Sequence, residues 1–285
     1  MRRPPLWEGT KVSSIIWKGY LLYSDAAFTL IQSPFTHDGE RVFGADSDAT
    51  TLAVAALQHR LNQQPITSVT VPDGIDSPTL SSATGIKVAD EITFDDCEWD
   101  LLLSDEATVV LVQRGTEVEL PQFDVDIPVD SDFFSALEGA WIEELQASNV
   151  SQGAYISMAQ YEEAAGPRLG LLGQKFAQGM TWPPRQMDGD QPAGVEHIAL
   201  EHVGHVQSWT RLSAAGAPSE FSIRAPLLGG ISTVLLRLND GPSGVFLVVD
   251  DEEPEISMDL EMELVVRRIY AQEGIIRYGL KARAI

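Results

Sequence analysis

Cys97 is the single cysteine of the chain and the residue best suited to act as a nucleophile in acyl transfer. Such a thiolate needs a helix N-terminus or a neighbouring cation to favour its charged form, and further groups to bind the oxyanion. Cys97 instead lies in the acidic run Phe94-Asp95-Asp96-Cys97-Glu98-Trp99-Asp100, whose negative field disfavours a thiolate. The sequence therefore indicates that Cys97 is not catalytic, and we interpret the run as a solvated loop.

Other catalytic signatures are missing from the sequence. It contains no Gly-x-Ser-x-Gly elbow, phosphate loop, dinucleotide fingerprint or His-Glu-x-x-His motif. The short glycine clusters at 170–173 and 229–230 are interpreted as turns. An enzyme that worked alone would need a nucleophile that the sequence does not show, so we expect a protein that is not itself an enzyme.

A metal site is not expected either. One cysteine rules out an internal disulfide and a thiolate zinc cluster. His197, His202 and His205 lie close together in the chain, but a spacing of three residues on an extended strand puts His202 and His205 on opposite faces. Ordinary strand positions are the preferred interpretation, with zinc ligation as the alternative.

Composition limits the partners. The net charge is −23, from 42 acidic and 19 basic residues, and the acidic excess is concentrated in residues 1–150. This charge repels phosphate backbones, which argues against nucleic-acid binding. No signal-peptide-like or membrane-spanning apolar run is found, so a cytoplasmic location without membrane association is expected.

The first half predicts alternating strands and helices. We expect a strand pair, or a strand and a turn, at 12–23 interrupted at Gly19, a helix over 49–62 capped within Asp46-Ser47-Asp48, and strands at 66–71 and 100–113. Leu52, Ala55, Ala56 and Leu61 are expected to form the apolar face of that helix. This pattern predicts an α/β fold.

The second half predicts a small β-barrel. An amphipathic helix is expected over 133–146, and we place the domain boundary after it, near 147–153. Short apolar runs separated by Gly, Pro and Asp then follow without a long helix, as a small barrel requires. The runs are 198–206, 208–212, 231–238, 245–249, 262–269 and 275–281.

Five segments of the second half occur in an informative order. They are Ser157-Met158-Ala159-Gln160-Tyr161-Glu162-Glu163, Trp182-Pro183-Pro184-Arg185, the run 204–210, Asp240-Gly241-Pro242 and Ile276-Arg277-Tyr278-Gly279-Leu280-Lys281. Together they resemble the acyl-CoA-associated OB-fold family also called domain of unknown function 35. In that family a short helix and a rubredoxin-like zinc ribbon precede the barrel. The resemblance implies a helical lead-in and ribbon remnant over 148–195 and an OB-fold barrel over 196–285.

The sequence departs from the family at the metal. The family brackets its Pro-Pro-Arg segment with two pairs of cysteines, whereas residues 174–179 and 186–193 contain none. The resemblance therefore implies a ribbon that has lost its zinc.

The resemblance also implies a function. Family members act as scaffolds for thiolases and hydroxymethylglutaryl-CoA synthases and help to hold the pantetheine arm of coenzyme A, so we expect a hetero-oligomer with coenzyme A thioesters as possible ligands. A suitable groove would be apolar with a few cations. The candidate residues are Lys175, Trp182, Arg185, Trp209, Arg211 and Arg224. The structural alternative is that Arg185 caps local carbonyls and that both tryptophans fill the core.

Two further interpretations stay open. Residues 44–56 and 12–23 are similar to the start of hydroxymethylglutaryl-CoA synthase-like thiolase-fold proteins, which implies that residues 1–147 are a truncated thiolase-like half kept for docking. A divergent nucleic-acid-binding OB-fold protein is the alternative function. It would need a basic barrel face with exposed aromatic residues.

Overall fold

The computed structural model describes residues 11–12, 15–88, 97–104, 106–146, 158–177, 179–184, 196–272 and 274–285. The chain divides into two compact units, Met1–Ser131 and Asp132–Ile285. The first is a mixed α/β region and the second contains a closed five-stranded β-barrel. The α/β first half and the all-β barrel predicted from the sequence are both found.

A seven-stranded mixed sheet forms the centre of the first unit, in the order β2-β3-β4-β10-β9-β7-β8. Its pairs are antiparallel except those that β7 makes with β8 and β9. The strands are β2 (Ile15–Trp17), β3 (Tyr20–Ser24), β4 (Phe28–Gln32), β7 (Ser68–Thr70), β8 (Lys87–Val88), β9 (Trp99–Ser104) and β10 (Thr108–Gln113). The remaining short strands are β1 (Lys11–Val12), β11 (Gln122–Phe123), β5 (Phe35–His37), β6 (Glu40–Arg41) and β12 (Ile127–Pro128).

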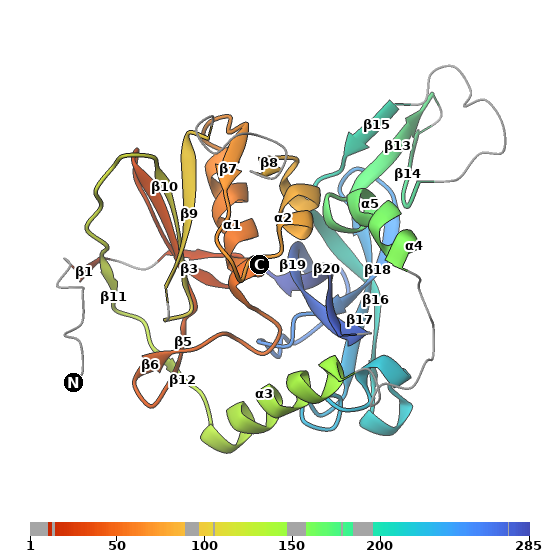
Figure 1. The fold of residues 1–285 in the computed structure, drawn as a ribbon. Helices are drawn as coiled ribbons and strands as arrows, with labels where there is room; N and C mark the ends of the chain where they lie inside the picture. The colour runs from red at the N-terminus through yellow and green to blue at the C-terminus, as the bar shows by residue number, and fades with distance from the viewer. Residues whose placement is uncertain are drawn as a thin grey trace. The chain divides into compact units, whose positions relative to one another are not determined.

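The helix expected over 49–62 is confirmed as α1 (Ala49–Leu61). Asp48 accepts a hydrogen bond from the Thr51 backbone N–H, and the Thr51 hydroxyl lies 2.9 Å from the Asp48 backbone nitrogen, which completes a capping box. Leu52, Ala55 and Ala56 are buried as expected and Leu61 is only half-buried, but burial is not confined to one face, because every residue from Ala49 to Leu57 is buried. Small side chains allow α1 to pack between β4, β10 and the second helix, α2 (Ser77–Thr84) (Figure 1).

The strands predicted in the first half are found, with two refinements. Lys18 and Gly19 form the turn between β2 and β3, and the 100–113 segment is a hairpin of β9 and β10. The acidic run is solvated only in part, because Cys97 and Trp99 are 3% and 4% exposed. Its residues 94–96 lie outside the described part of the chain.

The second unit begins with helices and a small sheet. α3 (Ser131–Leu145) confirms the amphipathic helix, and Leu137, Ala140, Trp141 and Glu144 are its buried residues. Then follow α4 (Met158–Glu163), α5 (Ala165–Leu169) and a three-stranded antiparallel sheet in the order β14-β13-β15. Its strands are β13 (Leu172–Phe176), β14 (Gly179–Thr181) and β15 (Glu196–Ala199). Part of the expected ribbon segment is thus a small sheet outside the barrel.

The barrel closes in the order β16-β17-β18-β20-β19, with β19 returning to β16. All its pairs are antiparallel except that of β18 with β20. Its strands are β16 (Val203–Leu212), β17 (Ile231–Leu238), β18 (Ser243–Val248), β19 (Glu261–Gln272) and β20 (Ile275–Ala284). Two short 3₁₀ helices, Ala214–Gly216 and Ser219–Phe221, lie between β16 and β17.

The first barrel strand differs from its prediction. The runs 198–206 and 208–212 were expected as two strands. Residues 200–202 instead belong to no strand, and the residues after them form the single strand β16. An irregularity between Val206 and Ser208 absorbs Gln207, so pairing with β17 continues on both sides of it.

No helix among the described residues is long and apolar enough to span a membrane.

Candidate functional site

An apolar groove in the second unit is the best candidate for a binding site. It has a volume of about 400 Å³. One side is formed by α4, α5 and the Trp182-Pro183 segment, and the other by the barrel strands β18, β19 and β20. Val245, Leu247, Ile269 and Leu280 supply aliphatic surface from the barrel. Ligand pockets are commonly concave and mostly apolar with a few placed polar groups, and this groove has that form.

Trp182 closes part of the groove. Its indole stacks on Phe246, with 5.4 Å between the ring centroids, and its Nε1–H donates to the Pro167 carbonyl at 3.1 Å. The Trp182–Pro183 peptide bond is cis. Gly244 lets the indole approach the barrel, because a Cβ atom there would lie 2.6 Å from Cζ3 of Trp182.

We expect Gly244→Ala to displace Trp182 and to lower the free energy of unfolding by about 1–3 kcal/mol, the usual cost of overpacking. Chemical denaturation followed by tryptophan fluorescence checks this. Gly216→Ala is the control, because its new Cβ would meet only Ser213 Oγ at 3.8 Å. Equal losses in the two variants would contradict the close fit of Trp182.

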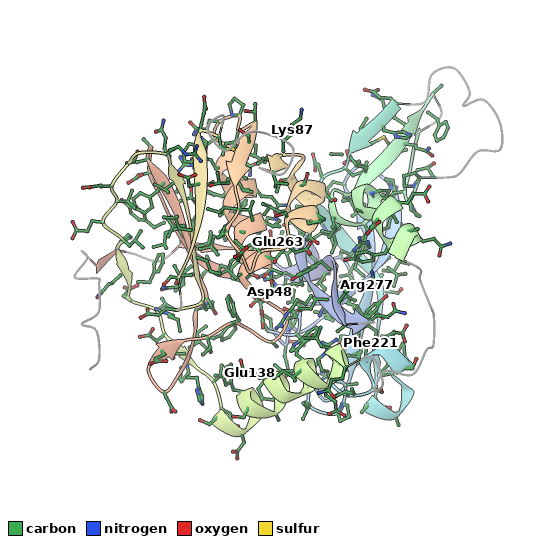
Figure 2. All side chains as sticks on the ribbon, in the orientation of Figure 1. Asp48, Lys87, Glu138, Phe221, Glu263 and Arg277 are labelled. Carbon is green, nitrogen blue, oxygen red and sulfur yellow. The ribbon has the colours of Figure 1, made fainter. Side chains whose placement is uncertain are left out.

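Two arginines and a tyrosine form the polar part of the groove. The guanidinium carbons of Arg168 and Arg277 lie 3.6 and 4.3 Å from the centroid of the Tyr161 ring. Arg168 Nη1 donates to the Tyr278 carbonyl, and Nη2 donates to the Tyr161 carbonyl at 3.1 Å. Arg277, labelled in Figure 2, comes from β20 and is 1% exposed. Cation–π contact and carbonyl acceptors therefore hold positive charge beside an apolar surface.

Tyr270 adds a hydroxyl to the same groove. Burial raises the pKa of Tyr270, while the positive charge of Arg277 opposes this shift. The phenol is therefore neutral at physiological pH and keeps a proton that it can donate.

Among the six residues predicted to bind acyl-CoA, Trp182 is the one that lines this groove. Lys175 is exposed on β13 and lies 3.9 Å from Glu196. Trp209 is 46% exposed on β16, and Arg211, two residues further along, is 3.4 Å from Glu253. Arg185 lies outside the described residues. Of the predicted cations that the structure describes, Lys175, Arg211 and Arg224 do not line the groove beside Trp182.

Arg224 lies in the interior. Its Nε donates to Glu144 at 2.7 Å, its Nη1 to Asp250 at 3.3 Å, and its Nη2 to the Ile269 carbonyl at 2.6 Å. The guanidinium also stacks on Trp141, 3.8 Å from the ring centroid. Because Arg224 is fully buried, these contacts give it a structural role, and we leave it out of the ligand surface.

Glu144 is the buried partner of that guanidinium. Burial raises the pKa of Glu144, whereas the charge and hydrogen bond of Arg224 and the Ala271 N–H oppose the shift. Lys281 belongs to the same cluster of charges, because its Nζ lies 2.9 Å from Oδ2 of Asp250. This interior network attaches α3 to the barrel.

The histidines do not assemble a metal site. His197 belongs to β15, His202 lies in the bend before β16, and His205 is exposed on β16. The premise that His202 and His205 share one extended strand is thus wrong. Within the described ranges, no group of three or more His, Cys, Asp or Glu side chains is placed to hold a metal ion.

Sequence reasoning missed Tyr161, Arg168, Tyr270 and Arg277 as groove residues. Tyr161 and Arg277 lie inside segments that carry the family resemblance, and this was the one available signal. Their charge and residue type alone did not separate them from the other arginines and tyrosines.

Comparison with known proteins gives a partial match. No family model matches the chain. Over 93 residues it is 31% identical to a DUF35 domain-containing scaffold protein of Pyrococcus furiosus. The match covers 32% of this chain and 64% of that relative, so the chain spans a little under two thirds of the relative's length.

Proposed function

We propose that this protein is a non-catalytic scaffold that associates with a thiolase, a hydroxymethylglutaryl-CoA synthase or both, and holds acyl-CoA intermediates between them. The observation that carries the proposal is the 93-residue similarity to a protein described as a scaffold. The closed five-stranded barrel is consistent with it. We infer from the strand order, first-second-third-fifth-fourth with one parallel pair, that this barrel is an OB fold.

The groove beside Trp182 supports the acyl-CoA part of the proposal. An apolar surface flanked by Arg168 and Arg277 suits a ligand with both hydrocarbon and hydrogen-bond-accepting parts. Lys175, Trp209 and Arg211 are exposed, and we keep them as candidates for contacts outside the groove. Arg185 remains a candidate on sequence grounds.

The zinc of the related ribbons does not fit this chain. A tetrahedral thiolate site needs four ligands, and the one cysteine, Cys97, belongs to the first unit. The proposed scaffold role therefore uses no metal.

The first unit is proposed to dock a partner as a thiolase-like half. The support is its mixed sheet with the buried α1 helix, together with the sequence similarity at 12–23 and 44–56. We expect the complex to be a cytoplasmic hetero-oligomer.

An affinity pull-down from the native cytoplasm, at its own salt concentration and followed by mass spectrometry, tests the scaffold role. We expect recovery of a thiolase or a hydroxymethylglutaryl-CoA synthase. An unrelated bait of comparable negative charge controls for ionic capture. Recovery of nucleic acid instead would favour the alternative OB-fold function, to which the exposed Trp209 would contribute a stacking surface.

Reconstitution of a thiolase or synthase preparation with this protein tests the scaffold role directly. A partner preparation that lacks this protein is expected to lose condensing activity and to regain it when the full chain is added. Complete activity in its absence would contradict the proposed role.

A further inference from the structure

The barrel wall of the groove is suited to hydrocarbon. Val245, Leu247, Ile269 and Leu280 present aliphatic side chains, and Trp182 adds an aromatic surface. Val245 is 69% exposed, so this wall is open to an incoming ligand. Amide groups placed against such side chains would lose hydrogen bonds to water without replacement, which is unfavourable. A hydrocarbon chain fits this wall better than the pantetheine arm with its two amides.

Arg168 gives the groove a positively charged group. Its Nη1 and Nη2 atoms are held by backbone carbonyls, and its guanidinium stacks on Tyr161. Its Nε atom is buried and has no hydrogen-bond partner among the described residues. Nε is therefore closed to the groove, but Arg168 as a whole is only half-buried and lines it, so a ligand oxygen beside the guanidinium would be stabilised by its positive charge.

The size of the groove limits the length of the chain. A dry apolar cavity of about 150 Å³ is large enough to bind benzene. The groove, at about 400 Å³, is more than twice that volume. By this comparison the volume leaves room for a straight chain of at least roughly ten carbons, which is much longer than an acetyl group.

We propose that this groove binds a medium-length straight acyl chain, with the hydrocarbon against Val245, Leu247 and Ile269 and the carbonyl oxygen beside the positively charged guanidinium of Arg168. The inference rests on the proposed function in one respect, namely that the acyl group arrives as a coenzyme A thioester. A free fatty acid has the same chain and an acceptor head group. The experiment therefore includes both sources.

Isothermal titration calorimetry of the full chain tests the proposal with coenzyme A, acetyl-CoA, octanoyl-CoA, decanoyl-CoA and decanoate. Each methylene buried in the groove should strengthen binding roughly fourfold. We therefore expect decanoyl-CoA to bind roughly sixteenfold more tightly than octanoyl-CoA, and both to bind far more tightly than acetyl-CoA. Affinities that do not depend on chain length would overturn the proposal.

Two matched variants locate the chain. Val245→Glu places a charge at the groove, and Ile142→Glu places the same charge on α3, away from it. Both native residues are β-branched and exposed, at 69% and 61%, so neither change should disturb the core. The affinity for decanoyl-CoA should be at least tenfold lower in Val245→Glu than in the native protein. It should be unchanged in Ile142→Glu. Equal affinities in the two variants would overturn the groove as the site.

Comparing decanoyl-CoA with decanoate identifies the source of the acyl chain. Decanoyl-CoA binding without decanoate binding supports the thioester, and decanoate binding that is sensitive to Val245→Glu supports a free fatty acid in the same groove. If neither ligand binds, the proposal is overturned. These results do not depend on the pull-down, so the scaffold role and the chain-length preference can fail separately.

Discussion

Replacing Glu144 by alanine is expected to lower the free energy of unfolding by about 3–5 kcal/mol, the usual cost of breaking a buried ion pair. Glu144 is fully buried and accepts hydrogen bonds from Arg224 Nε at 2.7 Å and from the Ala271 N–H at 3.3 Å. Without it, two buried cations, Arg224 and Lys281, would share Asp250 as their remaining carboxylate in this network. Urea denaturation followed by tryptophan fluorescence measures the loss.

The control for this prediction is Glu138→Ala, which removes an exposed carboxylate from the same helix (Figure 2). Its effect should stay within about 0.5 kcal/mol. Glu138 and Glu144 differ in burial and in their partners, so this comparison separates the buried pair from a general effect of charge or helix propensity.

A double variant tests whether the pair acts as a unit. Glu144→Met with Arg224→Met removes both charges and should be clearly less destabilised than the sum of the two single methionine variants, because neither charge is then left buried without the other. Strict additivity would show that Glu144 and Arg224 are not coupled, against their 2.7 Å contact.

Gly230→Ala is expected to be the most damaging glycine substitution near the start of β17. Gly230 has a φ of +123°, and a Cβ atom there would lie 2.3 Å from the carbonyl oxygen of Leu212. The left-handed conformation costs about 1–3 kcal/mol for a residue with a side chain. The steric clash adds about 1–3 kcal/mol, because the neighbour is backbone rather than a flexible side chain.

Gly241→Ala isolates the conformational cost. Gly241 also has a left-handed φ, of +108°, but a Cβ atom added there would meet no atom of the described residues within 4 Å. We therefore expect this variant to lose about 1–3 kcal/mol, and Gly230→Ala to lose at least about 1 kcal/mol more, in urea denaturation. Losses of the same size would mean that the Leu212 carbonyl moves away without cost. The comparison tests the start of β17 in the barrel, because Leu212 pairs there with Ile231.

Local chemistry made several elements predictable. Asp48 and Thr51 form a capping box through atoms that are three residues apart, so the start of α1 depends on neighbouring residues alone. The apolar run ending at Gln113 forms a strand wherever it is packed. The apolar runs of the second half likewise matched the barrel strands from β17 to β20, because their turn residues mark the strand ends.

Contacts between residues far apart in the chain could not be predicted from the sequence. Arg224 and Arg211 are alike as residues, yet one is buried against Glu144, 80 positions away, and the other is exposed beside Glu253. The irregularity at Gln207 is equally nonlocal, because it exists only relative to the pairing of β16 with β17. Neither spacing nor residue type contains this information.

By itself, the sequence determined the start of α1, the strand-forming runs of the barrel, the lack of cysteines for a thiolate metal site and the acidic balance, because each depends on nearby residues or on composition. Only the tertiary structure decided which side chains meet at the groove. Tyr161, Arg168 and Arg277 come from α4, α5 and β20, and the last two are 109 positions apart in the sequence. Closure of the barrel and packing of the helical lead-in bring them together, and those steps follow from burial of the whole apolar surface rather than from any local pattern.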